Sequence, residues 1–177
     1  MKVLFLDHDG VICLSNNFGS RFKKQRKWGQ RYQREYPLDA RFDNFDKKAV
    51  KVLNELIEET NLEIVVSSDW RTWATVDEMG DYYQSQGILK RPLDYTTTVL
   101  DHTFDFDPKF DLEQTRSLEI LDWLDKHSGV SHWVAVDDLD MSNLERNWGL
   151  SNFVHTTKPN EGIKKLGVKE QVLKFLK

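Results

Sequence analysis

The sequence is poor in the residues that would place it outside the cell or in a membrane. Its one cysteine, Cys13, excludes an internal disulfide, and the position of Cys13 after an apolar stretch favours a packed side chain. No apolar run approaches the roughly 20 residues that cross a bilayer. The first residues lack the basic start, long apolar stretch and small-residue cleavage site of an export signal. We therefore expect a cytoplasmic protein that does not enter membranes.

Positive charge is also scarce over the chain as a whole. The 25 Lys and Arg residues are outnumbered by 29 Asp and Glu residues, which gives a net charge of −4. Because nucleic-acid backbones attract Lys and Arg, this balance argues against a protein that binds nucleic acid over its whole surface. A length of 177 residues accommodates one α/β domain with a proper core and is short for two. We expect a single domain over residues 1–177.

One segment departs from this acidic average. Residues 14–42 are polar, basic and aromatic without a strand period, and residues 21–34 read RFKKQRKWGQRYQR with no acidic residue. We interpret residues 14–42 as a partly helical insertion that lies over the mouth of a site. Two roles stay open for it: a solvated amphipathic surface, or a substrate contact in which aromatic rings stack on bases and cations hold phosphates.

The stretch KVLFLDHDG at residues 2–10 is the first candidate site. Residues 3–6 form an apolar run that is typical of a strand buried on both faces in a parallel sheet. Asp7, Asp9 and Gly10 follow it directly, at the carboxyl end of the strand, where open α/β sheets bind ligands. An ordinary Asp-Gly turn is the plain alternative. Two carboxylates on one side of a strand repel each other, so a nearby cation is expected.

Apolar strands and amphipathic helices alternate along the rest of the chain. This alternation predicts a Rossmann-like, three-layer α/β sandwich with a mostly parallel sheet and helices on both faces. Residues 101–111, rich in Asp and Phe, are expected to form a loop beside the site that supplies no metal ligand. Helices are expected over residues 44–61, 73–86, 115–127 and 168–176, and strands over residues 62–68, 94–100, 133–136 and 152–156.

The predicted strand at residues 62–68 ends in two hydroxyl groups, those of Ser67 and Ser68, and Arg71 follows shortly after. A serine at such a place either contacts a ligand or caps the next helix. Arg71 either holds a phosphate through its planar guanidinium or forms a surface ion pair with a neighbouring acid. Both interpretations stay open for each of these residues.

Two further candidates come from the second half of the chain. Arg116 lies in the first turn of the helix predicted at residues 115–127, where it either balances the acids or faces solvent. Asp137 and Asp138 end the third apolar strand. A lone Asp-Asp pair would normally form a turn, but this pair stands at the same edge of the predicted sheet as Asp7.

The stretch VLFLDHDGV resembles the first motif of the haloacid dehalogenase superfamily of aspartate-nucleophile phosphatases. In that resemblance Ser67 takes the place of the second motif, Arg116 that of the third-motif cation, and Asp137-Asp138 that of the last motif. SSDWR, RSLEILDWL, VAVDDLDM and VHTTKPNEGI also resemble a small-domain branch that includes the phosphatase domain of multidomain RNA-repair proteins. The chain departs from that branch at residues 160–163 and in the basic insertion, and it has no room for the large cap domain of some relatives.

The resemblance implies a magnesium-dependent phosphomonoesterase. Mg²⁺ would be held by Asp7, Asp138 and the backbone carbonyl of Asp9, with Asp137 as an outer or alternative ligand. Asp7 would attack phosphorus to form an aspartyl-phosphate, which divides one difficult displacement into two easier ones. Asp9 would act first as a general acid and then as a general base.

Other residues would act on the phosphate group and not on the cation. Ser67 and Arg116 would stabilise its equatorial oxygens, while Gly10, Ser68 and Arg71 would contact the substrate. A terminally phosphorylated RNA or DNA, or a nucleotide, is the expected partner. Two alternatives stay open: a soluble 5′-nucleotidase or small-metabolite phosphatase, and a nucleic-acid-binding module without turnover. The sequence does not give the oligomeric state.

Overall fold

The order of the strands places the first strand at the centre of the sheet. The structure is a computed structural model, and it describes residues 1–97 and 111–177. All strand pairs are parallel, in the order β3-β2-β1-β4-β5. The strands are β1 (Lys2–Leu6), β2 (Glu63–Val66), β3 (Asp94–Tyr95), β4 (His132–Asp137) and β5 (Phe153–His155). The predicted Rossmann-like sheet is confirmed. β2 and β3 lie on one side of β1, and β4 and β5 lie on the other. The switch point at which such sheets bind ligands is therefore between β1 and β4.

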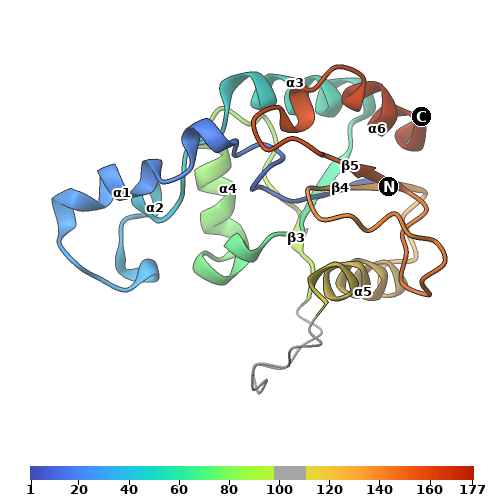
Figure 1. Cartoon of the computed structure of the whole chain (residues 1–177), viewed down its shortest axis with the longest axis horizontal. Helices are drawn as coiled ribbons and strands as arrows, with labels where there is room; N and C mark the ends of the chain where they lie inside the picture. Colours follow the sequence, from blue (N-terminus) through green and yellow to red (C-terminus); the bar gives the residue numbers. More distant parts are fainter. Residues whose placement is uncertain (98–110) are drawn as a thin grey trace.

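Helices cover both faces of the sheet, because side chains along each strand alternate between the two faces. The main helices are α3 (Lys47–Thr60), α4 (Val76–Ser85), α5 (Leu112–Asp125) and α6 (Val168–Leu176). Leu4 and Leu6 pack on the face that α3, α4 and α6 cover, whereas Val3 and Phe5 pack on the face that α5 covers. Figure 1 shows α3 and α6 on one side of the sheet and α5 on the other. The predicted three-layer arrangement is therefore confirmed.

The two ends of α3 follow from its capping residues. Asp46 Oδ1 accepts the backbone N–H groups of Lys48 and Ala49, both at 2.9 Å. These bonds satisfy N–H groups that have no partner within the first turn, so the helix begins slightly later than predicted. Asn61 ends the helix in the left-handed conformation, with φ 52°. The predicted stop at Asn61 is confirmed.

The predicted start of α5 is wrong. The helix begins at Leu112 and not at residue 115, because the Asp111 side chain accepts the N–H of Gln114 at 3.1 Å and caps the helix earlier. Arg116 therefore lies in the second turn of α5 and not in the first. The side chain still reaches the carboxyl edge of the sheet, as described below.

The insertion consists of short helices joined by loops. They are η1 (Ser15–Asn17), α1 (Ser20–Gln25), η2 (Arg26–Trp28), η3 (Gln33–Glu35) and α2 (Leu38–Arg41). In Figure 1 this segment projects away from the sheet beside α4. Two arginines fasten it to η4 (Asp69–Trp73): Arg34 Nε donates to the carbonyl of Thr72 at 2.6 Å, and Arg41 Nη1 donates to that of Trp73 at 3.3 Å.

Part of one predicted strand and most of a predicted loop lie outside the described residues. β3 covers only the first two residues of the strand expected over 94–100, and residues 98–110 are not described. The predictions for β2, β4, β5, α4 and α6 are confirmed to within a few residues. Within residues 1–97 and 111–177 there is no large cap domain, and no helix combines the length and apolar composition that a bilayer crossing needs.

Candidate active site

Three side chains of the candidate site are brought together by the register of the sheet. Leu6 of β1 is aligned with a valine of β2 and with Val136 of β4. The next residues along the three strands are Asp7, Ser67 and Asp137. Asp7 N–H donates to the carbonyl of Val136 at 3.1 Å, and Ser67 N–H donates to that of Leu6 at 3.0 Å. The parallel register thus gathers these three residues at the carboxyl edge of the sheet.

Asp7, Asp137 and Asp138 form a compact acidic cluster. One carboxylate oxygen from each residue lies within 4.8 Å of the other two. Asp7 and Asp137 are buried, with exposures of 5% and 1%, while Asp138 is exposed. Three anionic oxygen ligands at this spacing fit a hard cation such as Mg²⁺. The structure therefore brings together the three side chains that were predicted to hold or flank the metal.

Burial and mutual repulsion make the carboxyl groups of this cluster hard to ionise. Burial raises the pKa of Asp7 well above its usual value, and the charge of Asp137 adds to this effect, while Arg116 opposes it. Burial also raises the pKa of Asp137 to about 7 and raises the pKa of Asp138. A bound divalent cation favours the charged form of each acid and so acts against all three shifts. The electrostatics of the cluster therefore fit a cation site.

Arg116 connects these acids to the neighbouring strand. Its side chain is buried, and Nη1 donates to Asp7 Oδ1 at 3.2 Å and to Asp137 Oδ2 at 3.1 Å. Nη1 also donates to the carbonyl oxygen of Ser67, and Nη2 donates to Asp69 Oδ1 at 3.1 Å. A guanidinium with these partners does not face solvent, so the structure excludes that alternative for Arg116.

Asp9 stands apart from the acidic cluster. Its Oδ2 accepts the indole N–H of Trp70 at 3.0 Å, a contact that the local sequence does not predict. Asp9 reaches the surface, but partial loss of hydration raises its pKa. The hydrogen bond from Trp70 lowers the pKa, and the charge of Asp43 raises it. A raised pKa favours the protonated form that a general acid needs. The backbone carbonyl of Asp9 as a metal ligand stays a prediction.

The two serines that follow β2 have different surroundings. The Ser67 hydroxyl is buried, and it has no hydrogen-bond partner within residues 1–97 and 111–177. A buried hydroxyl without a partner is costly, and a phosphate oxygen would supply the missing acceptor. Ser68 is the N-cap of η4, where its hydroxyl accepts the N–H of Trp70 in a long bond of 3.5 Å. Helix capping, which was one alternative for this pair, thus applies to Ser68.

Gly10 allows the first motif to lie against Asp138. Its φ of +72° is a left-handed conformation, and a Cβ at this position would lie 2.6 Å from Asp138 Oδ2. Thr156 ties the same region together: its N–H donates to the carbonyl of Asp137 at 2.9 Å, and its Oγ1 donates to that of Gly10 at 3.1 Å. Sequence reasoning missed Thr156, although its place directly after the last strand, at the same sheet edge, was a signal that could have found it.

Arg71 is engaged within the protein. Its Nη2 donates to both carboxylate oxygens of Glu119 at 2.7 Å, and its Nη1 donates to Thr96 Oγ1 at 2.9 Å. The pair is buried and not on the surface, because the two charged side chains are only 9% and 2% exposed. Of the two interpretations of Arg71, the structure shows the ion pair, and a contact with substrate phosphate stays a prediction.

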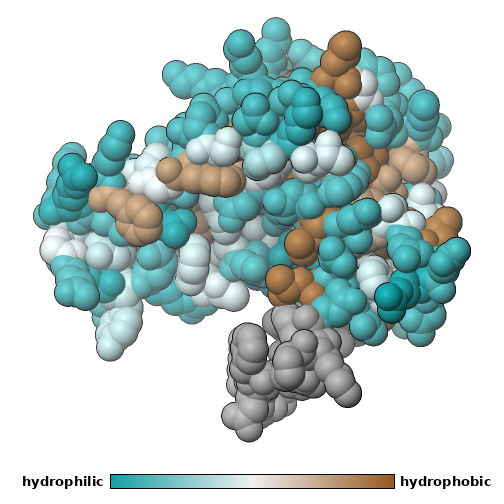
Figure 2. All heavy atoms as spheres, in the orientation of Figure 1, coloured by the Kyte–Doolittle hydropathy of each residue, from teal (hydrophilic) through white to brown (hydrophobic). Residues whose placement is uncertain are grey.

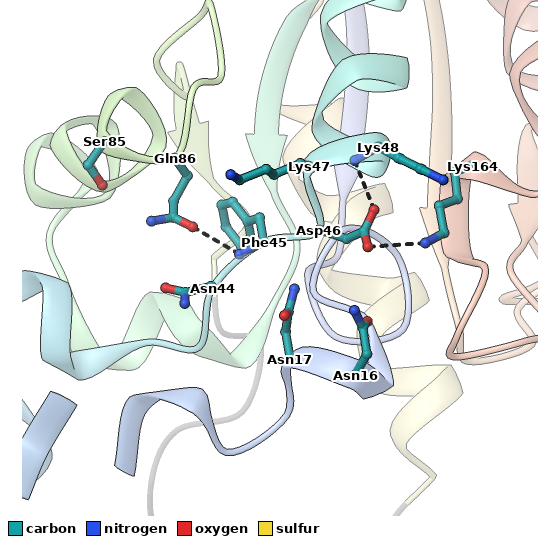
Figure 3. A pocket seen from close by; sticks show the side chains of 10 residues that line it. All are labelled: Asn16, Asn17, Asn44, Phe45, Asp46, Lys47, Lys48, Ser85, Gln86 and Lys164. Carbon is teal, nitrogen blue, oxygen red and sulfur yellow. Dashed lines mark hydrogen bonds and ion pairs between the residues drawn. The ribbon is translucent and has the colours of Figure 1, made fainter. Parts of the chain in front are cut away.

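A large cavity on the surface is lined by other residues. It measures about 740 Å³ and lies between η1, the start of α3 and the end of α4 (Figure 3). Lys47, Lys48 and Lys164 surround its one acid, Asp46, which pairs with Lys164 at 3.1 Å. None of the three acids of the cluster lines it. A cavity with a single, neutralised carboxylate offers no set of ligands for a cation, so the acidic cluster is the better candidate for chemistry.

The raised pKa of Asp137 predicts that the metal-free protein becomes less stable as the pH rises toward neutrality. The folded-state pKa of about 7 exceeds the usual 3.8, so between these values the native state binds more protons at Asp137 than the unfolded state does. The contribution of Asp137 to stability therefore falls as the pH rises from about 4 to about 7. Each pH unit between the two pKa values corresponds to about 1.4 kcal/mol, or about 3–6 °C in Tm for a domain of this size.

Thermal melts of wild type and Asp137→Asn in EDTA measure this contribution. The Tm of the variant relative to wild type should rise across that pH window, because asparagine has no proton to lose. Added Mg²⁺ should reduce or reverse the advantage of the variant, since cation binding favours ionised acids. A Tm difference that does not change with pH would contradict the raised pKa.

A family profile matches nearly the whole chain. Its description is HAD domain in Swiss Army Knife RNA repair proteins, and it covers residues 3–167. The matched range contains the acidic cluster together with Asp9, Ser67 and Arg116. No curated protein and no solved structure gave a match. The match and the fold therefore point to the same kind of domain.

Proposed function

The chain belongs to the family of HAD domains from Swiss Army Knife RNA repair proteins, and on this basis we propose that it is a magnesium-dependent phosphomonoesterase that acts through an aspartyl-phosphate. The proposed substrate is a phosphorylated nucleic-acid end. The observation that carries the proposal is the single guanidinium of Arg116, which contacts Asp7, Asp137 and the strand end at Ser67. This arrangement supports a nucleophile, a cation site and phosphate-binding donors at one point.

In the first step, a carboxylate oxygen of Asp7 attacks phosphorus in line with the leaving oxygen. A bond forms between Asp7 and phosphorus, the bond to the leaving oxygen breaks, and that oxygen takes the proton of Asp9. Asp7 must be ionised to attack, and the positive charge of Arg116 at 3.2 Å favours this form. Mg²⁺ bound at the acidic cluster would supply further positive charge that lowers the pKa of the acids and offsets the charge of the phosphate.

In the second step, Asp9 is a carboxylate and takes a proton from water. The water oxygen attacks phosphorus, the bond between phosphorus and Asp7 breaks, and phosphate leaves. In both steps negative charge gathers on the equatorial oxygens, and the hydroxyl of Ser67 and the guanidinium of Arg116 are the donors proposed to bind them. Both acids end in the protonation states in which they began.

The surface of the insertion supports nucleic acid as the substrate class. Lys23, Arg26 and Lys27 are exposed, and none of them forms an ion pair with the residues that the structure describes. Bases stack on exposed aromatic rings, and cations hold the phosphates between them. Figure 2 shows the lobe of the insertion as mostly hydrophilic, with isolated hydrophobic side chains at its surface. Four of its large aromatic side chains are exposed: Phe18 (48%), Phe22 (57%), Trp28 (44%) and Tyr32 (83%).

The insertion also contacts residues next to Asp9. Phe42, directly after α2, stacks on Trp70 with 4.9 Å between the ring centroids, and Trp70 hydrogen-bonds to Asp9. Arg21 pairs with Asp43 at 3.3 Å, and the charges of both residues act on Asp9. These contacts attach the base of the insertion to the region around the proposed general acid.

Phosphate release from three substrates tests the proposal: a terminally phosphorylated oligonucleotide, a mononucleotide and 4-nitrophenyl phosphate. Wild type with Mg²⁺ should prefer the oligonucleotide, and EDTA should stop turnover. Lys23→Glu/Lys27→Glu should lower kcat/KM for the oligonucleotide roughly tenfold or more and leave 4-nitrophenyl phosphate unchanged. Lys51→Glu/Lys174→Glu is the matched control, with the same charge change at exposed positions of α3 and α6, and it should alter neither.

Other outcomes of this experiment identify the alternatives. A preference for the mononucleotide that the insertion variant leaves unchanged would indicate a nucleotidase or small-metabolite phosphatase. Oligonucleotide binding without phosphate release from any substrate would indicate a binding module. Equal losses on the oligonucleotide and on 4-nitrophenyl phosphate in the insertion variant would contradict a role of the insertion in substrate contact.

A further inference from the structure

Trp70 contacts the carboxyl group of Asp9, an acid that is not part of the acidic cluster. Its side chain is 2% exposed, and its Nε1–H donates to Asp9 Oδ2 at 3.0 Å. Asp9 itself is exposed, so burial does not hold its carboxyl group in one rotamer; besides Trp70, the Cys13 thiol is a hydrogen-bond partner of this group. The hydrogen bond from Trp70 therefore fixes a group that burial does not fix.

The indole of Trp70 is held in place by its own neighbours. It lies nearly parallel to the rings of Phe42 and Phe45, with centroids 4.9 Å and 5.4 Å away and interplanar angles of 16° and 14°. The ring of His8 lies 4.7 Å away, and the Ser68 hydroxyl accepts the Trp70 backbone N–H. Rotation of the indole would break these contacts in a closely packed interior. The direction of the indole N–H is thus set by the fold.

The hydrogen bond from Trp70 favours one oxygen of Asp9 as the carrier of the proton. An indole N–H can only donate, so Oδ2 accepts; the carbonyl oxygen of a neutral acid is a better acceptor than its hydroxyl oxygen, so this contact favours the proton on Oδ1. We propose that Trp70 is a positioning residue that holds Asp9 with Oδ1 directed at the leaving oxygen of the substrate. This inference rests on the proposed function, in which Asp9 is the general acid.

The same contact assists both steps of the reaction. As the bond between phosphorus and the leaving oxygen breaks, the proton passes from Oδ1 of Asp9 to that oxygen, and Asp9 becomes a carboxylate. A hydrogen bond from an N–H group to a carboxylate is stronger than one to a neutral acid, so the Trp70 contact strengthens as the proton departs. In the second step Oδ1 takes a proton from the attacking water.

The dependence of rate on the leaving group tests this role. β-(3-Benzothienyl)alanine at position 70 replaces the indole N–H with sulfur and keeps the shape and packing of the ring. For an oligonucleotide end or glycerol phosphate, kcat/KM should fall roughly 10- to 100-fold, because an alkoxide leaves poorly without a proton. For 4-nitrophenyl phosphate it should change by less than about threefold, because nitrophenolate leaves without one.

Three further variants separate positioning from packing. Trp70→Phe should show the same difference between substrates, and its melting temperature reports the loss of ring contacts. Trp73→Phe, in the same short helix and also next to Phe42, is the matched control and should leave both substrates unchanged. In an Asp9→Asn background the benzothienyl replacement should have no further effect on the oligonucleotide, since the group that it positions is gone.

The outcomes distinguish this inference from the proposed function. Equal slowing of both substrates by the benzothienyl variant, or of neither, would overturn the positioning role while the activity of wild type stands. An additional loss in the Asp9→Asn background would also overturn it. If wild type released phosphate from no substrate, the proposed function would fail first, and this inference would fail with it.

Discussion

Replacement of Asp7 with asparagine is expected to abolish turnover and to leave the fold intact. Asparagine keeps the size of the side chain and an oxygen that can accept from Arg116, but a neutral amide does not attack phosphorus. We expect kcat to fall on the order of 10⁴-fold or more, the scale on which the loss of an enzyme's nucleophile acts. Steady-state phosphate release with Mg²⁺ measures it, and substantial turnover by the variant would exclude Asp7 as the nucleophile.

The stability of the same variant provides an independent check. Burial and the charge of Asp137 raise the pKa of Asp7, so a neutral group at this position relieves the metal-free protein of an unfavourable charge. Asp7→Asn should therefore melt at a higher temperature than wild type in EDTA and gain less from Mg²⁺. Asp140→Asn, which changes an exposed acid shortly after Asp138, is the matched control and should keep full activity.

Replacement of Arg116 with alanine is expected to have the largest effect on stability. The guanidinium pairs with Asp7, Asp137 and Asp69, and removing one partner from a buried ion network costs about 3–5 kcal/mol. For a domain of this size that corresponds to roughly 10 °C in Tm. The loss should be larger at high pH than at low pH, because the acids left behind become charged as the pH rises. Without this donor, kcat should fall about 10²- to 10³-fold.

Three comparisons separate the buried network from a general effect of removing an arginine. Arg91 pairs with Asp81 at 2.7 Å at the surface, and Arg91→Ala should cost less than about 1 kcal/mol. Mg²⁺ should restore part of the stability lost in Arg116→Ala, because the cation neutralises the same acids. Equally small losses in both alanine variants would show that Arg116 does not stabilise the fold. Arg116→Lys should fall between wild type and alanine, since one ammonium cannot replace a planar fork.

Helix ends show where local sequence was sufficient for prediction. The stop of α3 at Asn61 and the extent of α6 followed from apolar spacing and from residues that end helices, which are all local signals. The start of α5 is not predictable from the local sequence, because its cap, Asp111, closes a stretch rich in Asp and Phe whose composition favours a loop. No apolar period precedes residue 115 to mark the added turn.

The motif SSDWR shows where local sequence was not sufficient. Arg71 pairs with Glu119, which is 48 residues away along the chain, and Trp70 hydrogen-bonds to Asp9, which is 61 residues away. The spacing of residues within the motif contains no information on either partner. Both pairings depend on how η4 and α5 pack against the carboxyl edge of the sheet.

The sequence by itself determined the parallel sheet and the edge at which the acids meet. Apolar strands that end in Asp7 and Asp137 are recognisable from a few consecutive residues, and parallel strands place their carboxyl ends at one edge. Only the tertiary structure decided the partners: Arg116 with these acids, and Trp70 with Asp9. The physical reason is the distance along the chain over which each signal acts. Periodicity and capping act over a few residues, whereas these ion pairs and hydrogen bonds join distant residues and depend on how the helices pack on the sheet.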